Sequence, residues 1–199
     1  MTTPESNSLL QQALLYIDEA NSADPNLDTD ETGVSVAKEL LYGQRMSAVL
    51  SQLYPNASVH LQIAARAQHM ERWKSLRSDY PEGRAGYKKW RAELGLFHAT
   101  RAAECMTVAG YRTEDCDRVK YLVQKRQIKR DEETQALEDC ACIVFLSFYL
   151  NAFIIKHNDD KLIDIIQKTW AKMSDHGHTA ALKLNFSPKA QELIERALA

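Results

Sequence analysis

The sequence predicts an all-α protein, a single helical-bundle domain, and three features of its 199 residues carry this prediction. Apolar residues recur at the helical spacing of three and four positions along nearly the whole chain, whereas the alternation typical of strands is almost absent. Only 7 glycines and 5 prolines interrupt this pattern. No repeat or shift of composition divides the chain, which is long enough for one sizeable core. We expect one domain over residues 1–199, with residues 1–34, a helix and a loop, packed on the bundle.

Apolar stripes and end signals place the helices in order. Leu9 to Ile17 form the first stripe, and the polar segment 21–32 predicts a loop. The second helix is expected over 35–53 and the third over 58–76, with Ser58 as its cap. A loop over 79–86 precedes a fourth helix that ends at Gly110. The remaining helices are expected to open near residues 113, 131, 160 and 187, the last with Pro188 in its first turn; residues 175–178 are expected to be a solvated turn.

Charge and composition favour a cytoplasmic protein without bulk attraction to nucleic acid or membranes. The formal net charge is -2, so any phosphate site must come from a local cluster of arginines. The N-terminus shows no signal peptide. The apolar run 140–155 is shorter than a membrane span and predicts a core helix. Four cysteines, Cys105, Cys116, Cys140 and Cys142, have no paired spacing and are expected to be buried thiols.

Polar residues fall on helix faces that should be apolar. In the fourth helix, His98 lies at the centre of the inward stripe, flanked by Arg91 and Arg101. In the third helix, Arg66 and His69 share one edge with Trp73, and Arg72 lies beside them. A buried unpaired charge costs roughly several kcal/mol, so such groups must be paired, solvated in a cleft, or bound to an anion.

Two carboxylates, Glu138 and Asp139, precede the apolar run of the central helix. Either one could orient a histidine, coordinate a metal or pair with an arginine. An internal salt-bridge network is the simpler interpretation of each residue alone. The basic groups outnumber the acids, however, and this favours a ligand site for the whole set.

The leading hypothesis is therefore a site for a phosphorylated or otherwise anionic small molecule, which the protein could hydrolyse. The expected anion-binding residues are Arg66, Arg72, Arg84, Arg91 and Arg101. His69 or His98 would act as acid or base, with Asp139 orienting it or sharing a divalent metal with Glu138. The alternative is a non-catalytic interaction module whose polar cluster fixes helix packing. Nucleic-acid binding through the basic connector 125–130 is the least favoured reading.

Several segments resemble a widespread family of unknown function, some of whose members carry a glutamyl-tRNA synthetase label. They are residues 38–46, 64–69, 72–73, 80–81, 83–87, 90–91, 97–98, 137–139, 160–162 and 168–173, which span most of the chain. The chain has neither the length nor a nucleotide-binding motif of such a synthetase. The resemblance therefore implies no particular activity.

A second resemblance links Leu61 to Met70 with the helix of HD-type phosphohydrolases that ends in a metal-binding His-Asp pair. On that likeness His69 and Asp139 match metal ligands, and the fold would be HD-like. Met70 stands where the family has the Asp, and Gln44 near its earlier histidine. A thioether does not replace a carboxylate for a hard cation. The resemblance thus implies either a lost metal or a centre rebuilt from His69, His98, Glu138 and Asp139.

Overall fold

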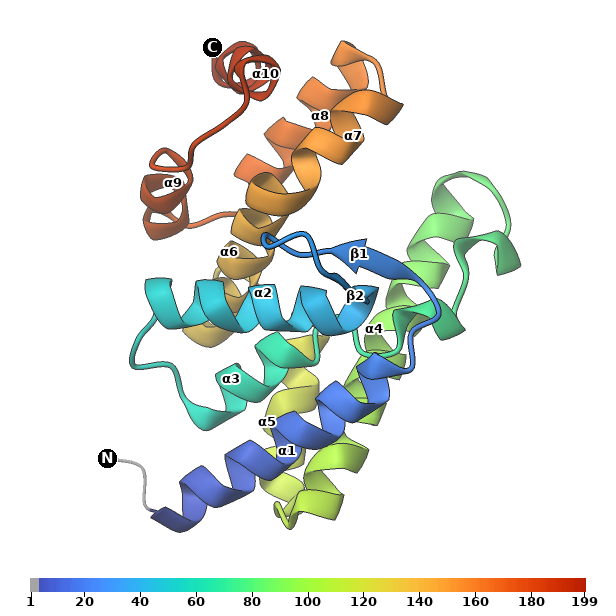
Figure 1. The fold of residues 1–199 in the computed structure, drawn as a ribbon, viewed down its shortest axis with the longest axis vertical. Coiled ribbons are helices and arrows are strands. Elements are labelled where there is room, and N and C mark those ends of the chain that lie inside the picture. The colour runs from blue at the N-terminus through green and yellow to red at the C-terminus, as the bar shows by residue number, and fades with distance from the viewer. Residues whose placement is uncertain (1–3) are drawn as a thin grey trace.

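The computed structural model describes residues 4–199 and is predominantly helical, which confirms the all-α prediction (Figure 1). The helices are α1 (Pro4–Ser22), α2 (Lys38–Leu53), α3 (Val59–Arg66), α4 (Gly83–Ala109), α5 (Thr113–Val123), α6 (Glu132–Val144), α7 (Leu150–Lys156), α8 (Asp159–Trp170), α9 (Asp175–Ala181) and α10 (Pro188–Leu198). Short 3-10 turns lie at Arg72–Lys74 and Arg77–Asp79, and a π-helical turn at Phe145–Tyr149 joins α6 to α7.

The continuous segment from α6 to α7 runs through the molecule (Figure 1). Its α6 part contacts α2, α3, α5 and α9, and its α7 part contacts α8 and α10. Helix α2 packs against α3 and α6, whereas the long α4 packs against α5 and α1. At the other end of the molecule, α10 packs on α8, and α9 packs on α6. Residues 1–3, the start of the N-terminal part expected to pack on the bundle, lie outside the described residues, and α1 contacts α2, α3 and α4.

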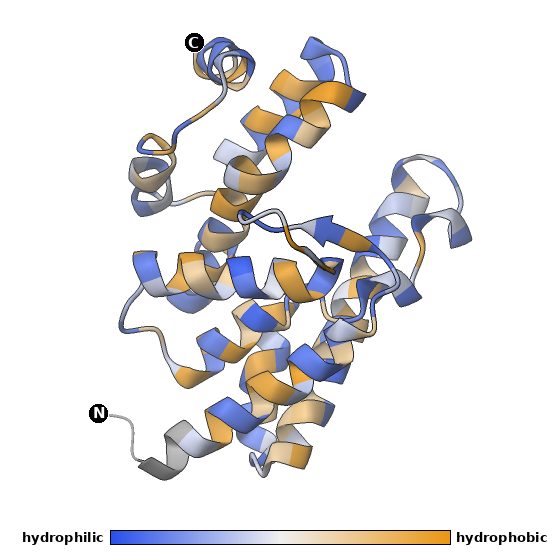
Figure 2. Ribbon diagram, viewed as in Figure 1, coloured by the Kyte–Doolittle hydropathy of each residue, from blue (hydrophilic) through white to orange (hydrophobic). Residues whose placement is uncertain are grey.

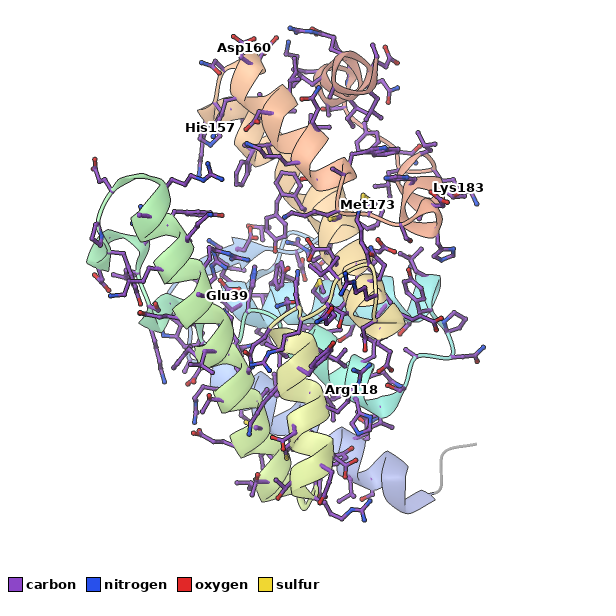
Figure 3. The ribbon with its side chains drawn as sticks, turned by 180° about the vertical axis from the view of Figure 1, so that it is seen from behind. Glu39, Arg118, His157, Asp160, Met173 and Lys183 are labelled. Atoms are coloured by element: carbon purple, nitrogen blue, oxygen red, sulfur yellow. The ribbon has the colours of Figure 1, made fainter. Side chains whose placement is uncertain are left out.

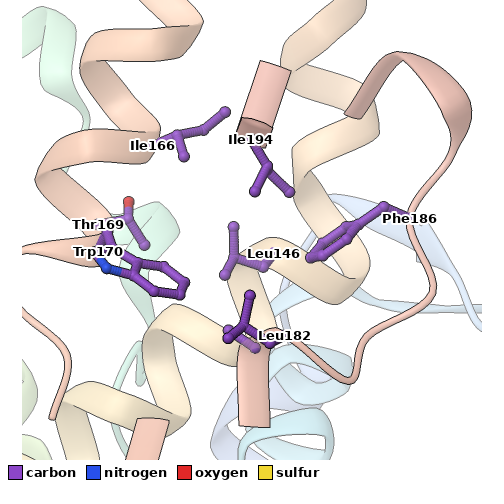
Figure 4. A pocket seen from close by; sticks show the side chains of 8 residues that line it. Leu146, Ile166, Thr169, Trp170, Leu182, Phe186 and Ile194 are labelled. Atoms are coloured by element: carbon purple, nitrogen blue, oxygen red, sulfur yellow. The ribbon is translucent and has the colours of Figure 1, made fainter. Parts of the chain in front are cut away.

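One connected apolar core draws residues from α1 through α10, including the fully buried Ile17, Met46, Leu137 and Leu193. Hydrophobic residues run through α6 and α7 in Figure 2. At the C-terminal end the core closes around a cavity of about 10 Å³ (Figure 4), and apolar burial of this kind supplies most of the free energy of folding. All four cysteines are free and buried, as the sequence predicted.

Within residues 4–199, the segment Glu132–Lys156 is long and apolar enough to cross a membrane, with a mean hydropathy of 1.6 over its most apolar window. Of that window, 44% is buried inside the protein. Leu137, Cys140 and Val144 are fully buried among the neighbouring helices. The α6 part of the segment therefore lies in the core, whereas Ile155 in α7 is 86% exposed.

Local signals set most helix ends where they were expected. The Ser58 side chain accepts a hydrogen bond from the Leu61 N–H, and Asp131 and Ser187 cap α6 and α10 in the same way. Gly110 ends α4 with φ at 98°, a left-handed value that glycine adopts without strain.

Four predicted boundaries are wrong. The third helix ends at Arg66 instead of near residue 76. The predicted loop over 21–32 contains β1 (Leu27–Thr29), which pairs antiparallel with β2 (Ser35–Ala37). Since β2 occupies the expected first residues of the second helix, α2 starts at Lys38 instead of residue 35. Helix α4 already begins at Gly83, and the predicted turn at 175–178 forms α9.

Candidate functional site

The early end of α3 shapes the candidate site. Residues 67–71 turn sharply, and Glu71 adopts a left-handed φ of 52°. The Glu71 N–H donates to Asn21 Oδ1 at 2.8 Å, and its carboxylate accepts from Arg101 Nε at 2.5 Å. These tertiary bonds stabilise a conformation that is unfavourable for a non-glycine residue.

The turn presents two consecutive residues to different partners. The Met70 carbonyl accepts a hydrogen bond from Nδ1 of the buried His98 on α4, at 2.6 Å. Burial lowers the pKa of His98 to about 3, so its imidazole is neutral and Nε2 is an acceptor. No protein group within residues 8–199 bonds that Nε2. The neighbouring His69 side chain is 23% exposed and has other partners.

His69 lies where three concavities meet. Their volumes are about 290, 390 and 300 Å³, in the range of roughly 300–1,000 Å³ typical of small-molecule sites. Glu39 lines the first, Glu138 the second and His98 the third, while His69 lines all of them. Figure 3 shows Glu39 in the region between α4 and α6. We call the three concavities together the His69 cleft.

Three residues hold the imidazole of His69. Tyr42 stacks on it with ring centroids 3.8 Å apart and planes 12° apart. Arg72 Nη1 lies 3.2 Å from Nε2, and Glu39 Oε2 lies 3.3 Å from Nδ1. A guanidinium has only donors, so Nε2 accepts from Arg72, and the neutral ring carries its proton on Nδ1, facing Glu39.

Burial shifts the pKa values of both His69 and Glu39. Desolvation, together with the charges of Arg72 and Arg91, holds the pKa of His69 well below its ordinary value. Desolvation raises the pKa of Glu39 to about 7, against the pull of Arg72. Near neutral pH the cleft therefore holds a neutral histidine beside a carboxyl group that is about half protonated.

Arg72 and Arg91 bring two guanidinium groups to the same place, and the nearby Glu39 carboxyl acts on Arg72 without forming an ion pair with it. They lie 5.1 and 6.0 Å from the centroid of the Trp90 ring. Burial and then the charge of Arg91 lower the pKa of Arg72. In the part of the chain from residue 8 onward, neither arginine has a carboxylate oxygen within 4.0 Å. Arg91 is exposed to the cleft that it lines.

A second basic group comes from the connector that follows α5. Lys125 adopts a φ of 53°, and its Nζ lies 2.5 Å from Glu138 Oε2. Lys172, from the turn after α8, approaches the other oxygen of Glu138 at 3.4 Å. Although burial opposes the shift, the two ammonium groups hold the pKa of Glu138 below its usual range. Glu138 is thus ionised and already neutralised by lysines.

Asp139 lies elsewhere, which corrects its predicted role beside the histidines. It is fully buried, and it accepts hydrogen bonds from Tyr54 Oη at 2.7 Å, Gln135 Nε2 at 2.9 Å and the N–H of Ser174 at 2.8 Å. The Ser174 hydroxyl donates to it as well. Because consecutive helix residues point about 100° apart, Asp139 faces α9 while Glu138 faces the cleft. Asp139 therefore joins α2, α6 and α9.

Three predicted anion-binding arginines also lie outside the cleft. Arg66 pairs with Asp18 of α1 at 3.4 Å, and Arg101 pairs with Glu71 and Glu104. Arg84 is exposed near the start of α4 and lines none of the three concavities. Of the five arginines, the structure brings Arg72 and Arg91 to His69.

The residues of the cleft do not fit a metal centre. Within the described part of the chain, no three His, Cys, Asp or Glu side chains converge to hold an ion. Glu138 is neutralised by two lysines, and Asp139 is hydrogen-bonded on the far side of α6. The metal set expected from the HD resemblance is therefore not assembled.

Sequence reasoning missed Glu39, Tyr42 and Lys125. A signal for the first two was present, because Glu39, Tyr42 and Met46 lie at helical spacing on the inward stripe of α2, and Glu39 is as out of place there as His98 on α4. Lys125 gave no such signal, since it reads as part of a solvated basic connector.

The model of the family described as Domain of unknown function (DUF4202) matches residues 11–194 of the chain. No curated protein and no solved structure matches it. The likeness to HD-type phosphohydrolases thus stays a prediction.

Proposed function

We propose that this chain, which belongs to the family described as Domain of unknown function (DUF4202), binds a phosphorylated or otherwise anionic small molecule in the His69 cleft. The single observation behind this proposal is the meeting of Arg72 and Arg91 at His69 without a carboxylate partner in the described residues. A planar guanidinium group can donate two parallel N–H hydrogen bonds to two oxygens of the same phosphate or carboxylate.

The charge of the whole cleft supports the same ligand class. Cationic side chains that line it come from five positions, Lys38, Arg72, Arg91, Lys125 and Lys172. Among the described residues, two carboxyl groups line it, Glu39 and Glu138, and the first is about half protonated near pH 7. Like charges in a partly desolvated cleft repel one another, and a bound anion relieves that repulsion. The excess is local, because the net charge of the whole chain is -2.

The arrangement also supports hydrolysis of a phosphate ester. A ligand oxygen that draws Arg72 toward it would free His69 Nε2 to accept a proton from water. The water oxygen would then bond to phosphorus as the ester P–O bond breaks, and His69 would return the proton to the leaving oxygen. Glu39 would hold the imidazole in the required tautomer through Nδ1. No step of this scheme involves a metal.

Binding is tested by measuring phosphate, pyrophosphate and sulfate affinity at constant ionic strength, by calorimetry and thermal shift. We expect Arg91→Ala to lose at least about 1.5 kcal/mol of binding free energy, which is more than tenfold in affinity. The matched control is Arg112→Ala, because the Arg112 side chain is 84% exposed on the α4–α5 turn and has the same charge. Equal losses in the two variants, or no anion binding by the parent, would refute the proposal.

The competing interaction-module hypothesis makes the opposite prediction for stability. If the polar cluster only fixes helix packing, Arg91→Ala lowers the melting temperature and no anion raises it. Hydrolysis is tested separately by phosphate release from phenyl phosphate in the parent, Glu39→Gln and His69→Gln. Release that survives His69→Gln would exclude the imidazole as the base while leaving anion binding intact.

A further inference from the structure

An aromatic compartment adjoins the cationic part of the His69 cleft. The concavity of about 290 Å³ is lined by the rings of Tyr42, Phe145, Tyr149 and Phe153. Phe145 and Phe153 meet edge to face, with centroids 5.3 Å apart and planes at 87°. Phe153 is 37% exposed.

The two compartments are neighbours along one cleft. Tyr42, His69, Ala141 and Phe145 line both the aromatic concavity and the one that contains Arg91, Lys125 and Lys172. A ligand that filled both would pass directly over the imidazole of His69.

The aromatic walls are fixed by contacts on their outer sides. Tyr149 accepts a hydrogen bond from the buried Arg45 at 3.1 Å, and Arg45 lies 4.5 Å from the ring centroid of Phe148. Tyr42 is held against His69 by the near-parallel stack described above. Preformed flat walls favour a flat, rigid group, because stacking then costs little conformational entropy.

Polar groups at the edge of the aromatic compartment add selectivity. Lys38 and Glu39 line it beside the rings, together with His69 and Arg72, so it offers an ammonium donor and a carboxyl group next to the aromatic wall. A purely aliphatic ligand would leave both unpaired. An aromatic ring that carries nitrogen or oxygen at its edge would satisfy them.

We propose that the ligand is a phosphate ester that carries a planar aromatic ring, with the ring between Tyr42, Phe145 and Phe153 and the phosphate at Arg72 and Arg91. This inference rests on the proposed anion site and specifies what the anion is attached to. Arg72 lines the aromatic compartment and Arg91 the neighbouring one, so a phosphate between these two arginines lies where the compartments join at His69, with Lys125 and Lys172 beyond it.

The test compares ligands that differ only in the ring. Calorimetry would measure AMP against ribose 5-phosphate and phenyl phosphate against methyl phosphate, with adenosine as the ring without phosphate. We expect each aromatic ester to bind at least about tenfold more tightly than its partner, in keeping with the contribution of one stacked ring. Phe153→Ala should remove most of that advantage and leave ribose 5-phosphate affinity unchanged.

The outcomes separate this inference from the proposed function. Equal affinity within both pairs, with Arg91→Ala still weakening all four, would overturn the aromatic inference and leave the anion site standing. Adenosine binding as tightly as AMP would overturn it also, because the phosphate would not be engaged. Failure of every phosphate compound to bind would refute both. Phe153 is on the surface, so its variant is expected to fold, and its melting temperature verifies this.

Discussion

Replacement of Asp139 tests whether this carboxylate belongs to the site, as the sequence predicted, or to the framework, as the structure shows. The side chain is fully buried and ties together three elements through Tyr54, Gln135 and Ser174. Asp139→Ala would remove the acceptor that four partly buried donors share, of which Gln135 Nε2 keeps the Lys172 carbonyl as a second acceptor. A hydrogen bond to a charged group contributes roughly 1.5–3 kcal/mol, but bonds that share one carboxylate are not additive. We therefore expect a loss of about 4–6 kcal/mol from the free energy of unfolding.

Asp139→Asn is the matched variant. The carboxamide oxygen can accept from Gln135 Nε2 and the Ser174 N–H, which both bond Oδ1, and its NH₂ can donate to the hydroxyls of Tyr54 and Ser174 if these rotate. We expect a loss of about 1–2 kcal/mol, since the bonds lose their charge assistance. Phosphate affinity should be unchanged in Asp139→Asn.

Urea denaturation followed by circular dichroism measures both variants, with ΔG extrapolated to water. Total stabilities of small domains are about 5–15 kcal/mol, so the alanine variant would lose a large fraction of the whole. A loss of under about 1 kcal/mol in Asp139→Ala would refute the framework role. So would an Asn variant of unchanged stability that no longer bound phosphate, which would return Asp139 to the site.

Three further predictions concern the cleft itself. Arg91→Ala should change the free energy of unfolding, measured by urea denaturation, by less than about 0.5 kcal/mol. The reason is that Arg91 is exposed and has no carboxylate partner in the described chain. A loss above about 2 kcal/mol would favour the packing role. His98→Ala should lower the free energy of unfolding by about 2–4 kcal/mol in the same assay, because it leaves the Met70 carbonyl unpaired and opens a cavity. An unchanged free energy of unfolding would show that the buried bond to Met70 is unimportant. The pKa of Glu39 is about 7 in the folded protein, against an ordinary value of 4.5. The native state therefore binds this proton more tightly than the unfolded chain does, and the stability that it contributes is lost as the pH rises from about 4.5 through 7. The free energy of unfolding of Glu39→Gln, relative to that of the parent, should therefore rise by on the order of 3 kcal/mol between pH 4.5 and pH 8, as measured by denaturation at several pH values. A difference between the two proteins that does not vary with pH would refute the raised pKa.

Much of the helical framework was readable from local chemistry. Ser58, Asp131 and Ser187 act as caps because a side-chain oxygen satisfies an N–H that the first turn leaves free, and this requires only neighbouring residues. Gly110 ends α4 for an equally local reason. The hairpin of β1 and β2 was missed because strands of three residues are too short to show an alternating pattern.

The candidate site was predictable in part. His69, Arg72, Arg91 and His98 stood out because polar groups on an inward helix face demand a partner or a cavity, and the structure places all four at or next to one cleft. Arg101 stood out for the same reason, yet it is neutralised by Glu71 and Glu104. Periodicity reports the face on which a residue lies, but it does not report which opposite charge reaches it.

What the sequence by itself determined is the helical class, most helix ends and the presence of cationic groups that need a partner. Only the tertiary structure decided where α3 stops, because no glycine or proline marks Arg66 and the break is stabilised by Asn21 and Arg101, 50 and 30 residues away from Glu71. That break turns His69 into the cleft and separates it from Arg66. The two adjacent carboxylates Glu138 and Asp139 were likewise divided by the packing of α6, one toward Lys125 and one toward Ser174. Long-range contacts of this kind carry no local signature, since their energy depends on partners that only the folded chain brings together.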